Sequence, residues 1–230
     1  MPDFPYYPNQ KYIQKNWAPE RISVGDLMAM ANAQKLATQQ GILTPQLANH
    51  LLPIALVEGR FGRNETKSDS DYGLNHFGYP PTPERDAAFK KMGLQVGRFD
   101  LPPEASGWGD QELEAYARKQ PFYPIIKNDQ GYSLNDPEQG DLYAQENAPN
   151  NVDWKGMSAK LAALMLAEKA KIYGPDNAVE RWNGAGKKVS PSGKTVADSS
   201  QYKRKVSDMM LMLQDPHNAA LMQAYQGMLK

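Results

Sequence analysis

Apolar residues recur at helical spacing in several segments of the chain. In residues 156–173, Leu161 and Leu164 share one face, and Gly174-Pro175 then supplies a stop signal. Such a face predicts a helix that packs against a core. The same reasoning predicts helices at 22–40, 45–58, 84–92, 110–119, 176–182, 199–214 and 216–229.

One of these predicted helices is almost entirely apolar. Thr44 is a suitable N-cap, Pro45 favours the first helical position, and residues 51–57 form a nearly unbroken apolar run. A helix that is apolar on all sides is expected to be buried. Pro53 within it predicts a kink or a distorted turn, and the helix runs out at Glu58-Gly59-Arg60.

The segments between the helices are polar and rich in turn-forming residues. Residues 62–83 predict a loop or short hairpin, 183–198 a Gly/Lys/Ser loop, and 120–153 an irregular excursion that can include a hairpin. We therefore expect a mainly α fold with a minor hairpin and an irregular insertion at about 80–155.

The first 20 residues differ from the rest of the chain. Residues 1–20 are rich in Pro, Tyr and Asn, which suits an extended arm or a loosely ordered tail. We expect residues 21–230 to form one domain. The opening residues 1–5 lack the basic and apolar regions of a signal peptide, and no apolar run approaches the roughly 20 residues that span a bilayer. The sequence therefore predicts neither a signal peptide nor a membrane span.

Composition narrows the possible functions. The 26 Lys and Arg residues balance the 26 Asp and Glu residues, which argues against a protein whose main task is to hold nucleic acid. The absence of cysteine excludes a disulfide framework and a cysteine-based zinc site. His50, His76 and His217 are scattered without metal-ligand spacing, so we expect no metal site.

Glu58 is the most informative residue of the sequence, because it follows the apolar run directly. Burial raises the pKa of a carboxyl group, so a carboxyl at this position is expected to hold its proton near neutral pH. Cleavage of a glycosidic bond needs such a proton donor for the leaving oxygen. A solvated carboxylate at the end of a helix is the alternative interpretation.

Three segments around Glu58 resemble the soluble lytic transglycosylases. In that family a helix that starts with Pro ends in Glu, with Phe three residues later, as at Pro45, Glu58 and Phe61 here. A Gly-Leu-Met-Gln segment follows in the family. Here Gly73 and Leu74 match it, and Asn75-His76 replace Met-Gln.

The third segment lies far along the chain. Where the family carries Tyr-Asn-Ala-Gly, this chain has Trp182-Asn183-Gly184-Ala185-Gly186, followed by a helix with Tyr202 and Val206. A Trp can pack on a sugar face, but it cannot supply the phenolic hydroxyl that contacts the catalytic Glu. The resemblance covers about residues 43–79 and 157–210.

The resemblance implies a lysozyme-like fold and a non-hydrolytic cleavage of peptidoglycan. Glu58 would act as the single acid/base at the bond between N-acetylmuramic acid and N-acetylglucosamine, and the product would be a 1,6-anhydro sugar. No metal or organic cofactor is implied. The residues expected to contact the glycan are Tyr72, Asn75, His76, Trp182 and Asn183.

Two alternatives remain open at this point. A hydrolytic lysozyme would use a second carboxylate, for which Asp69 and Asp71 are candidates, although a turn or loop role suits both residues as well. A bacteriophage tail or internal virion protein that keeps a lysozyme-like fold would explain the altered motif and the missing signal peptide. We therefore expect a virion protein that acts in the host periplasm or cell wall, with residues 1–20 available to contact other virion proteins.

Overall fold

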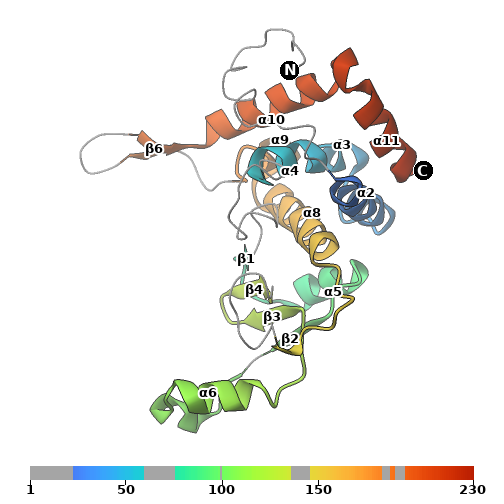
Figure 1. Cartoon of the computed structure of the whole chain (residues 1–230). Helices are drawn as coiled ribbons and strands as arrows, with labels where there is room; N and C mark the ends of the chain where they lie inside the picture. The colour runs from blue at the N-terminus through green and yellow to red at the C-terminus, as the bar shows by residue number, and fades with distance from the viewer. Residues whose placement is uncertain (1–22, 60–75, 99, 136–145, 183–186, 190–194) are drawn as a thin grey trace.

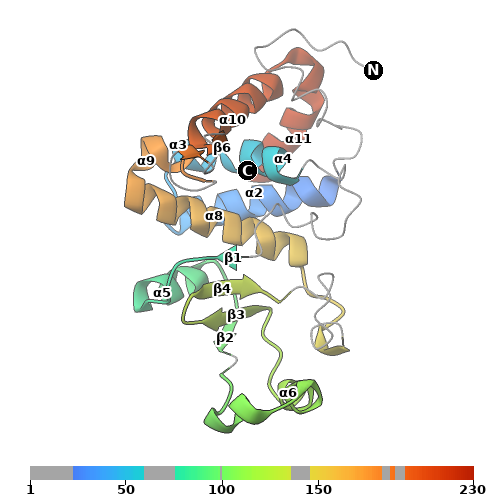
Figure 2. The same cartoon turned by 90° about the vertical axis from the view of Figure 1, so that its left-hand side faces the viewer.

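The molecule consists of a layered set of helices and a smaller lobe built on a β-sheet (Figure 1). The computed structural model describes residues 23–59, 76–98, 100–135, 146–182, 187–189 and 195–230. We call residues 76–135 the sheet lobe and the helices outside this stretch the helical body. Figure 2 shows helix α8 (Trp154–Tyr173) lying between the sheet and the other helices of the helical body, so it forms the boundary between the two parts.

The helical body surrounds one short apolar helix. Its elements besides α8 are α2 (Val24–Gln39), α3 (Pro45–Ala48), α4 (Leu51–Gly59), α9 (Pro175–Ala178), α10 (Ser199–Leu213), the 3-10 turn η6 (Pro216–Asn218) and α11 (Ala219–Leu229). Helix α4 packs against α2, α8 and α10, while α11 packs against α2. Three neighbouring helices leave α4 little contact with water, which explains why its sequence is apolar on every side.

Local signals in the sequence set the limits of the first helices as expected. The Ser23 hydroxyl caps α2 by accepting a hydrogen bond of 3.1 Å from the backbone N–H of Asp26. The Thr44 hydroxyl caps α3 in the same way, at 3.3 Å from the N–H of Leu47. Gly41, with a φ of 65°, follows the end of α2 in the left-handed conformation that glycine adopts without strain.

The segment predicted as one helix with a kink or distorted turn at Pro53 forms two helices, and the distortion lies ahead of the proline. Helix α3 ends at Ala48, and α4 starts at Leu51. A proline ring collides with the carbonyl four residues earlier, which here belongs to Asn49. The helix therefore breaks ahead of Pro53, and the proline stands in the first turn of α4, where its missing N–H has no intrahelical partner to lose.

The sheet lobe contains a four-stranded sheet in the order β1-β4-β3-β2. Its elements are β1 (His76–Phe77), α5 (Pro83–Lys91), β2 (Val96–Arg98), the 3-10 turn η4 (Pro103–Gly107), α6 (Asp110–Ala117), β3 (Ile125–Asn128) and β4 (Gly131–Leu134). The antiparallel pair β3–β4 confirms a hairpin within 120–153, and β2 pairs in parallel with β3. The stretch that we expected to be irregular is therefore largely regular in its described part.

Aromatic rings form the core of the sheet lobe. Phe89 of α5 stacks on Tyr132 of β4 with ring centroids 4.0 Å apart, and Phe77 of β1 meets both rings edge-on. Gly131 permits this arrangement, because a Cβ atom there would lie 2.2 Å from the carbonyl oxygen of Phe77. A side chain at position 131 would push β1 away from the sheet.

The segment before α10 is a hairpin and not the loop expected for 183–198. Strands β5 (Lys187–Val189) and β6 (Thr195–Asp198) pair antiparallel. The fold as a whole is mainly helical, as the sequence predicts. No helix within the described ranges combines the length and the apolar character that crossing a membrane requires.

Candidate active site at the end of helix α4

Glu58 is the acidic residue at the C-terminal end of the buried helix α4. Residues 51–57 are all buried, and the Glu58 side chain that follows them is half-buried. One of its carboxylate oxygens, Oε1, is enclosed by protein. The residue therefore combines a rigid support with partial access, which is what a side chain needs if it is to transfer a proton to a bound substrate.

Trp182 lies in the helical body, in the turn that follows α9. Its backbone N–H donates a hydrogen bond of 3.2 Å to the carbonyl of Val179. The residue is only 3% exposed and belongs to the hydrophobic core. A ring enclosed to this degree offers little surface to a sugar. Its expected contact with glycan stays a prediction, and in the structure the indole supports the core.

Tyr202 occupies a comparable buried position on α10, the helix that packs against α4. The side chain is 4% exposed, and its hydroxyl oxygen is enclosed by protein. The fold thus brings a phenol-bearing helix against the helix that ends in Glu58. Sequence spacing alone does not reveal this packing, because the two helices are far apart along the chain.

The other expected glycan contacts are not placed by the structure. Tyr72, Asn75 and Asn183 lie outside the described residues, as do the candidate second carboxylates at 69 and 71. The backbone of His76 is described, since it pairs with Ser133 across β1 and β4, but its side chain is not. These assignments stay predictions.

A polar cluster that the sequence did not reveal joins the two parts of the molecule. Arg85 of α5 forms an ion pair with Glu168 of α8 at 2.5 Å, and its guanidinium lies 5.3 Å from the ring centroid of Tyr79. The hydrogen bond that Arg85 donates to the Glu168 carboxylate raises the pKa of Arg85. Both partners of the ion pair are largely buried, so the contact fixes the sheet lobe against α8.

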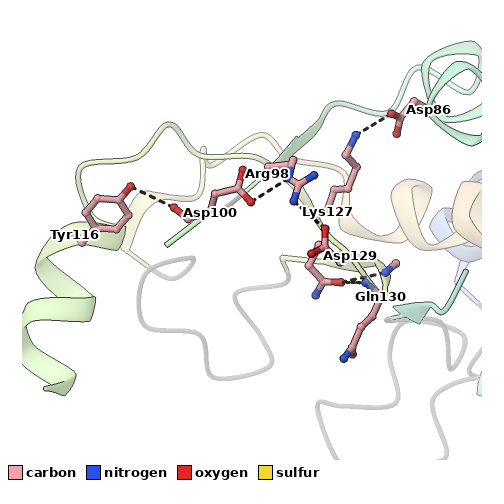
Figure 3. Close-up of polar contacts among 9 residues, drawn as sticks. Asp86, Arg98, Asp100, Tyr116, Lys127, Asp129 and Gln130 are labelled. Carbon is pink, nitrogen blue, oxygen red and sulfur yellow. Dashed lines mark hydrogen bonds and ion pairs between the residues drawn. The ribbon is translucent and has the colours of Figure 1, made fainter. Parts of the chain in front are cut away.

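A second polar network follows the outer edge of the sheet lobe (Figure 3). Arg98 of β2 binds Asp100 at 3.0 Å and Asp129 at 2.9 Å, while Lys127 of β3 binds Asp86 of α5 at 2.7 Å. Figure 3 also shows the Tyr116 hydroxyl of α6 donating to the backbone carbonyl of Asp100, at 3.2 Å. The charged groups in this network form ion pairs with each other, which favours a structural role for the network.

Burial and hydrogen bonding act in opposite directions on Asp86. Burial alone would raise the pKa of this carboxyl, but hydrogen bonds from Lys127 and Tyr132 outweigh it and lower the pKa below its usual value. The same bond acts on Tyr132 in the other direction, since burial and the neighbouring carboxylate raise the pKa of its phenol. Asp86 is therefore ionised and Tyr132 protonated under ordinary conditions.

The described residues contain no group of three His, Asp or Glu side chains arranged to hold a metal ion. Comparison with known proteins does not assign the chain to a family: no family model, no curated protein and no solved structure matches it.

Proposed function

We propose that this protein is a peptidoglycan-cleaving enzyme of the lytic transglycosylase type, with Glu58 as its acid/base. One observation supports the proposal above all. An acidic side chain, half-buried and with one enclosed oxygen, ends a helix that is otherwise apolar and held by three neighbours. The resemblance of residues 43–61 to the catalytic helix of that family supplies the substrate class.

In the proposed reaction Glu58 handles both proton transfers. Its carboxyl group donates a proton to the oxygen between N-acetylmuramic acid and N-acetylglucosamine as the C1–O bond breaks. The resulting carboxylate then takes the proton of the muramic C6 hydroxyl as that oxygen bonds to C1. The proton count balances, no water is consumed, and the products are a 1,6-anhydro end and a free sugar hydroxyl.

The decisive experiment compares the wild type with Glu58→Gln on a peptidoglycan zymogram. The amide keeps the shape of the side chain but cannot donate a carboxyl proton, so we expect at least about a 100-fold loss of clearing activity. Glu104→Gln is the matched control, because Glu104 is exposed on the sheet lobe. Glu58→Gln and Glu104→Gln should both give the wild-type circular dichroism spectrum, so that a loss of clearing is not a loss of folding. Equal clearing by the wild type and Glu58→Gln would contradict the assignment.

The chemistry of the product separates the transglycosylase from a hydrolytic lysozyme. Mass spectrometry of digested glycan should find 1,6-anhydro ends that are lighter than the hydrolysed ends by one water. Reducing ends would instead favour hydrolysis and direct attention to the carboxylates at 69 and 71, where Asp→Asn variants would then lose activity.

A structural virion protein with a lysozyme-like fold is the second candidate. Its support is the burial of Trp182, since the ring at a motif position expected to contact glycan belongs to the core. Under this proposal the chain is part of a phage tail or an internal virion component delivered with the particle. Absence of clearing by wild type and Glu58→Gln alike, together with recovery of the chain from purified particles, would favour this role.

A further inference from the structure

A cavity of about 380 Å³ opens between α3, α9 and α10, and its lining does not include Glu58. Its apolar part is formed by Leu47, Val179 and Val206, all of which are buried. The size falls within the range of small-molecule sites, roughly 300–1,000 Å³. A buried aliphatic floor beneath a polar rim is the usual composition of such a site.

The rim carries two opposite charges, the ammonium group of Lys203 and the carboxylate of Asp176. Lys203 donates a hydrogen bond of 3.1 Å to the backbone carbonyl of Asp176, a neutral acceptor. Within the described part of the chain, neither the Lys203 ammonium nor the Asp176 carboxylate takes part in an ion pair. The cavity therefore offers an ammonium group and a carboxylate to a ligand.

Two further groups on the same rim, an imidazole and a hydroxyl, have hydrogen-bonding capacity left. The His50 Nδ1 lies 3.3 Å from the carbonyl of Leu47, and a carbonyl only accepts, so this nitrogen is the donor and Nε2 is the acceptor of the neutral form of the ring. The Thr44 hydroxyl oxygen accepts from the N–H of Leu47, which leaves its proton to be donated elsewhere. The rim thus holds one further acceptor and one further donor beside the two charges.

Two other cavities of the molecule lack this combination. In one, Arg85 pairs with Glu168 and Lys171 with Glu84, so the charges neutralise each other. In the other, between α4, α10 and α11, the lining carries no charged side chain. Its buried amide and phenol groups bind each other, since the Tyr225 hydroxyl donates to Gln34 at 2.6 Å and Gln34 donates to Asn49 at 3.0 Å.

We propose that the cavity between α3, α9 and α10 binds a small zwitterion, namely an α-amino acid with an aliphatic side chain. Lys203 and the Thr44 hydroxyl bind its carboxylate, and Asp176 and the His50 Nε2 bind its ammonium group. The aliphatic side chain lies on the apolar floor. This binding is independent of the cleavage reaction proposed for Glu58.

The test is isothermal titration calorimetry of the full chain with L-leucine and two derivatives. N-acetyl-leucine keeps the carboxylate but removes the positive charge, and leucine amide does the reverse. We expect leucine to bind saturably. Each derivative should bind at least about tenfold more weakly, because it lacks one of the two charged groups of leucine. No saturable binding of leucine up to about 10 mM, or equal binding of N-acetyl-leucine, would overturn the proposal.

Variants at the rim then locate the site. Lys203→Met should weaken leucine binding about tenfold and abolish the preference for leucine over leucine amide. Asp176→Asn should instead abolish the preference over N-acetyl-leucine. Lys90→Met and Asp110→Asn, at exposed positions of the sheet lobe, are the matched controls and should bind as the wild type does. Loss of binding in a control, or unchanged preferences in both rim variants, would refute this location.

The Glu58→Gln variant tests whether leucine binding and glycan cleavage are independent. It should bind leucine with wild-type affinity while losing glycan cleavage, so that failure of either proposal is seen separately. Loss of leucine binding in this variant, with its circular dichroism unchanged, would contradict a ligand site independent of Glu58.

Discussion

The helical body and the sheet lobe are stabilised by different kinds of contact. Helix α2 packs along α8, and many buried positions of these two helices are alanines, such as Ala31, Ala33 and Ala159. Small side chains let helices approach closely along their length. The sheet lobe instead buries large rings, chiefly Phe89 and Tyr132, and fixes its strands through ion pairs. Stabilisation is thus spread over many small contacts in one part and concentrated in a few residues in the other.

This difference matters for the candidate active site. Glu58 stands on the helix that three others surround, so its position depends on the dispersed packing of the helical body. The sheet lobe is joined to that body through the Arg85–Glu168 ion pair and through a hydrophobic cluster that contains both Phe89 and Leu161. We expect damage to the lobe to remain local and damage to the helical body to reach Glu58.

The largest effect is expected from Phe89→Ala, which removes the central ring of the lobe. Phe89 is 1% exposed, and both Phe77 and Tyr132 contact it. The loss should lower the free energy of unfolding by about 4 kcal/mol, most of it in the lobe. Amide hydrogen exchange followed by mass spectrometry should show protection lost in β1, β3 and β4 and retained in α2 and α8.

Leu161→Ala is the counterpart in the helical body. Leu161 is 1% exposed on α8, and its truncation should cost about 3 kcal/mol. Protection should then fall in α2, α4 and α10 together, because these helices share one core. A uniform loss of protection over the whole chain for both variants would show that the two parts unfold as one unit, and the comparison would fail.

A smaller effect is expected from Tyr132→Phe, which removes one hydrogen bond of the lobe. The buried phenol donates to Asp86 at 2.7 Å, and a bond to a charged acceptor at such a site contributes about 2 kcal/mol. Tyr116→Phe is the control, with little effect, because its bond to the carbonyl of Asp100 is exposed and 3.2 Å long.

The effect of Tyr132→Phe should depend on pH. Since the folded pKa of Asp86 is lowered, its stabilisation is present above the unfolded value of 3.8 and is lost as the pH falls through the folded pKa. Urea denaturation at about pH 7 and about pH 2.5 should therefore give a large and a small difference from the wild type, respectively. An equal difference at both values would mean that the ring packing, and not the bond to Asp86, is disturbed.

The sequence predicts the helical body much better than the sheet lobe, for a physical reason. The helix over 156–173 was expected from the spacing of Leu161 and Leu164 and is found as α8, because a helix is specified by contacts within a few residues. The parallel pairing of Val96 with Ile125 has no comparable local signal. It depends on how the intervening chain folds back, which the residue pattern around either strand does not contain.

The same distinction applies to the candidate active site. The position of Glu58 at the end of a buried helix follows from the apolar run before it, and the structure confirms that burial over 51–57. The enclosure of Trp182 could not be predicted, because it depends on the elements that pack around the turn after α9. Residue type indicated an aromatic platform, whereas tertiary packing makes that ring part of the core.

The smallest effect is expected at the boundary between the two parts, where α8 carries Lys169. This side chain is 8% exposed, and its Nζ lies 5.7 Å and 5.8 Å from the ring centroids of Tyr79 and Tyr173. In the part of the chain that the structure describes, no carboxylate lies within ion-pair distance of it. Burial lowers the pKa of Lys169, which means that folding works against its charge.

Lys169→Met should therefore stabilise the protein by about 1 kcal/mol at neutral pH, since the thioether fills similar space without a charge. A lowered folded pKa means that the unfolded chain binds more protons between the folded and unfolded values, so wild-type stability rises with pH across that window. The advantage of Lys169→Met should accordingly shrink as the pH approaches about 10. Lys160→Met, a less buried change on the same helix, is the matched control. A loss of stability in Lys169→Met would mean that attraction to the two rings outweighs the cost of burial. The boundary would then resemble the sheet lobe, where a few aromatic residues dominate, more than the helical body to which α8 belongs.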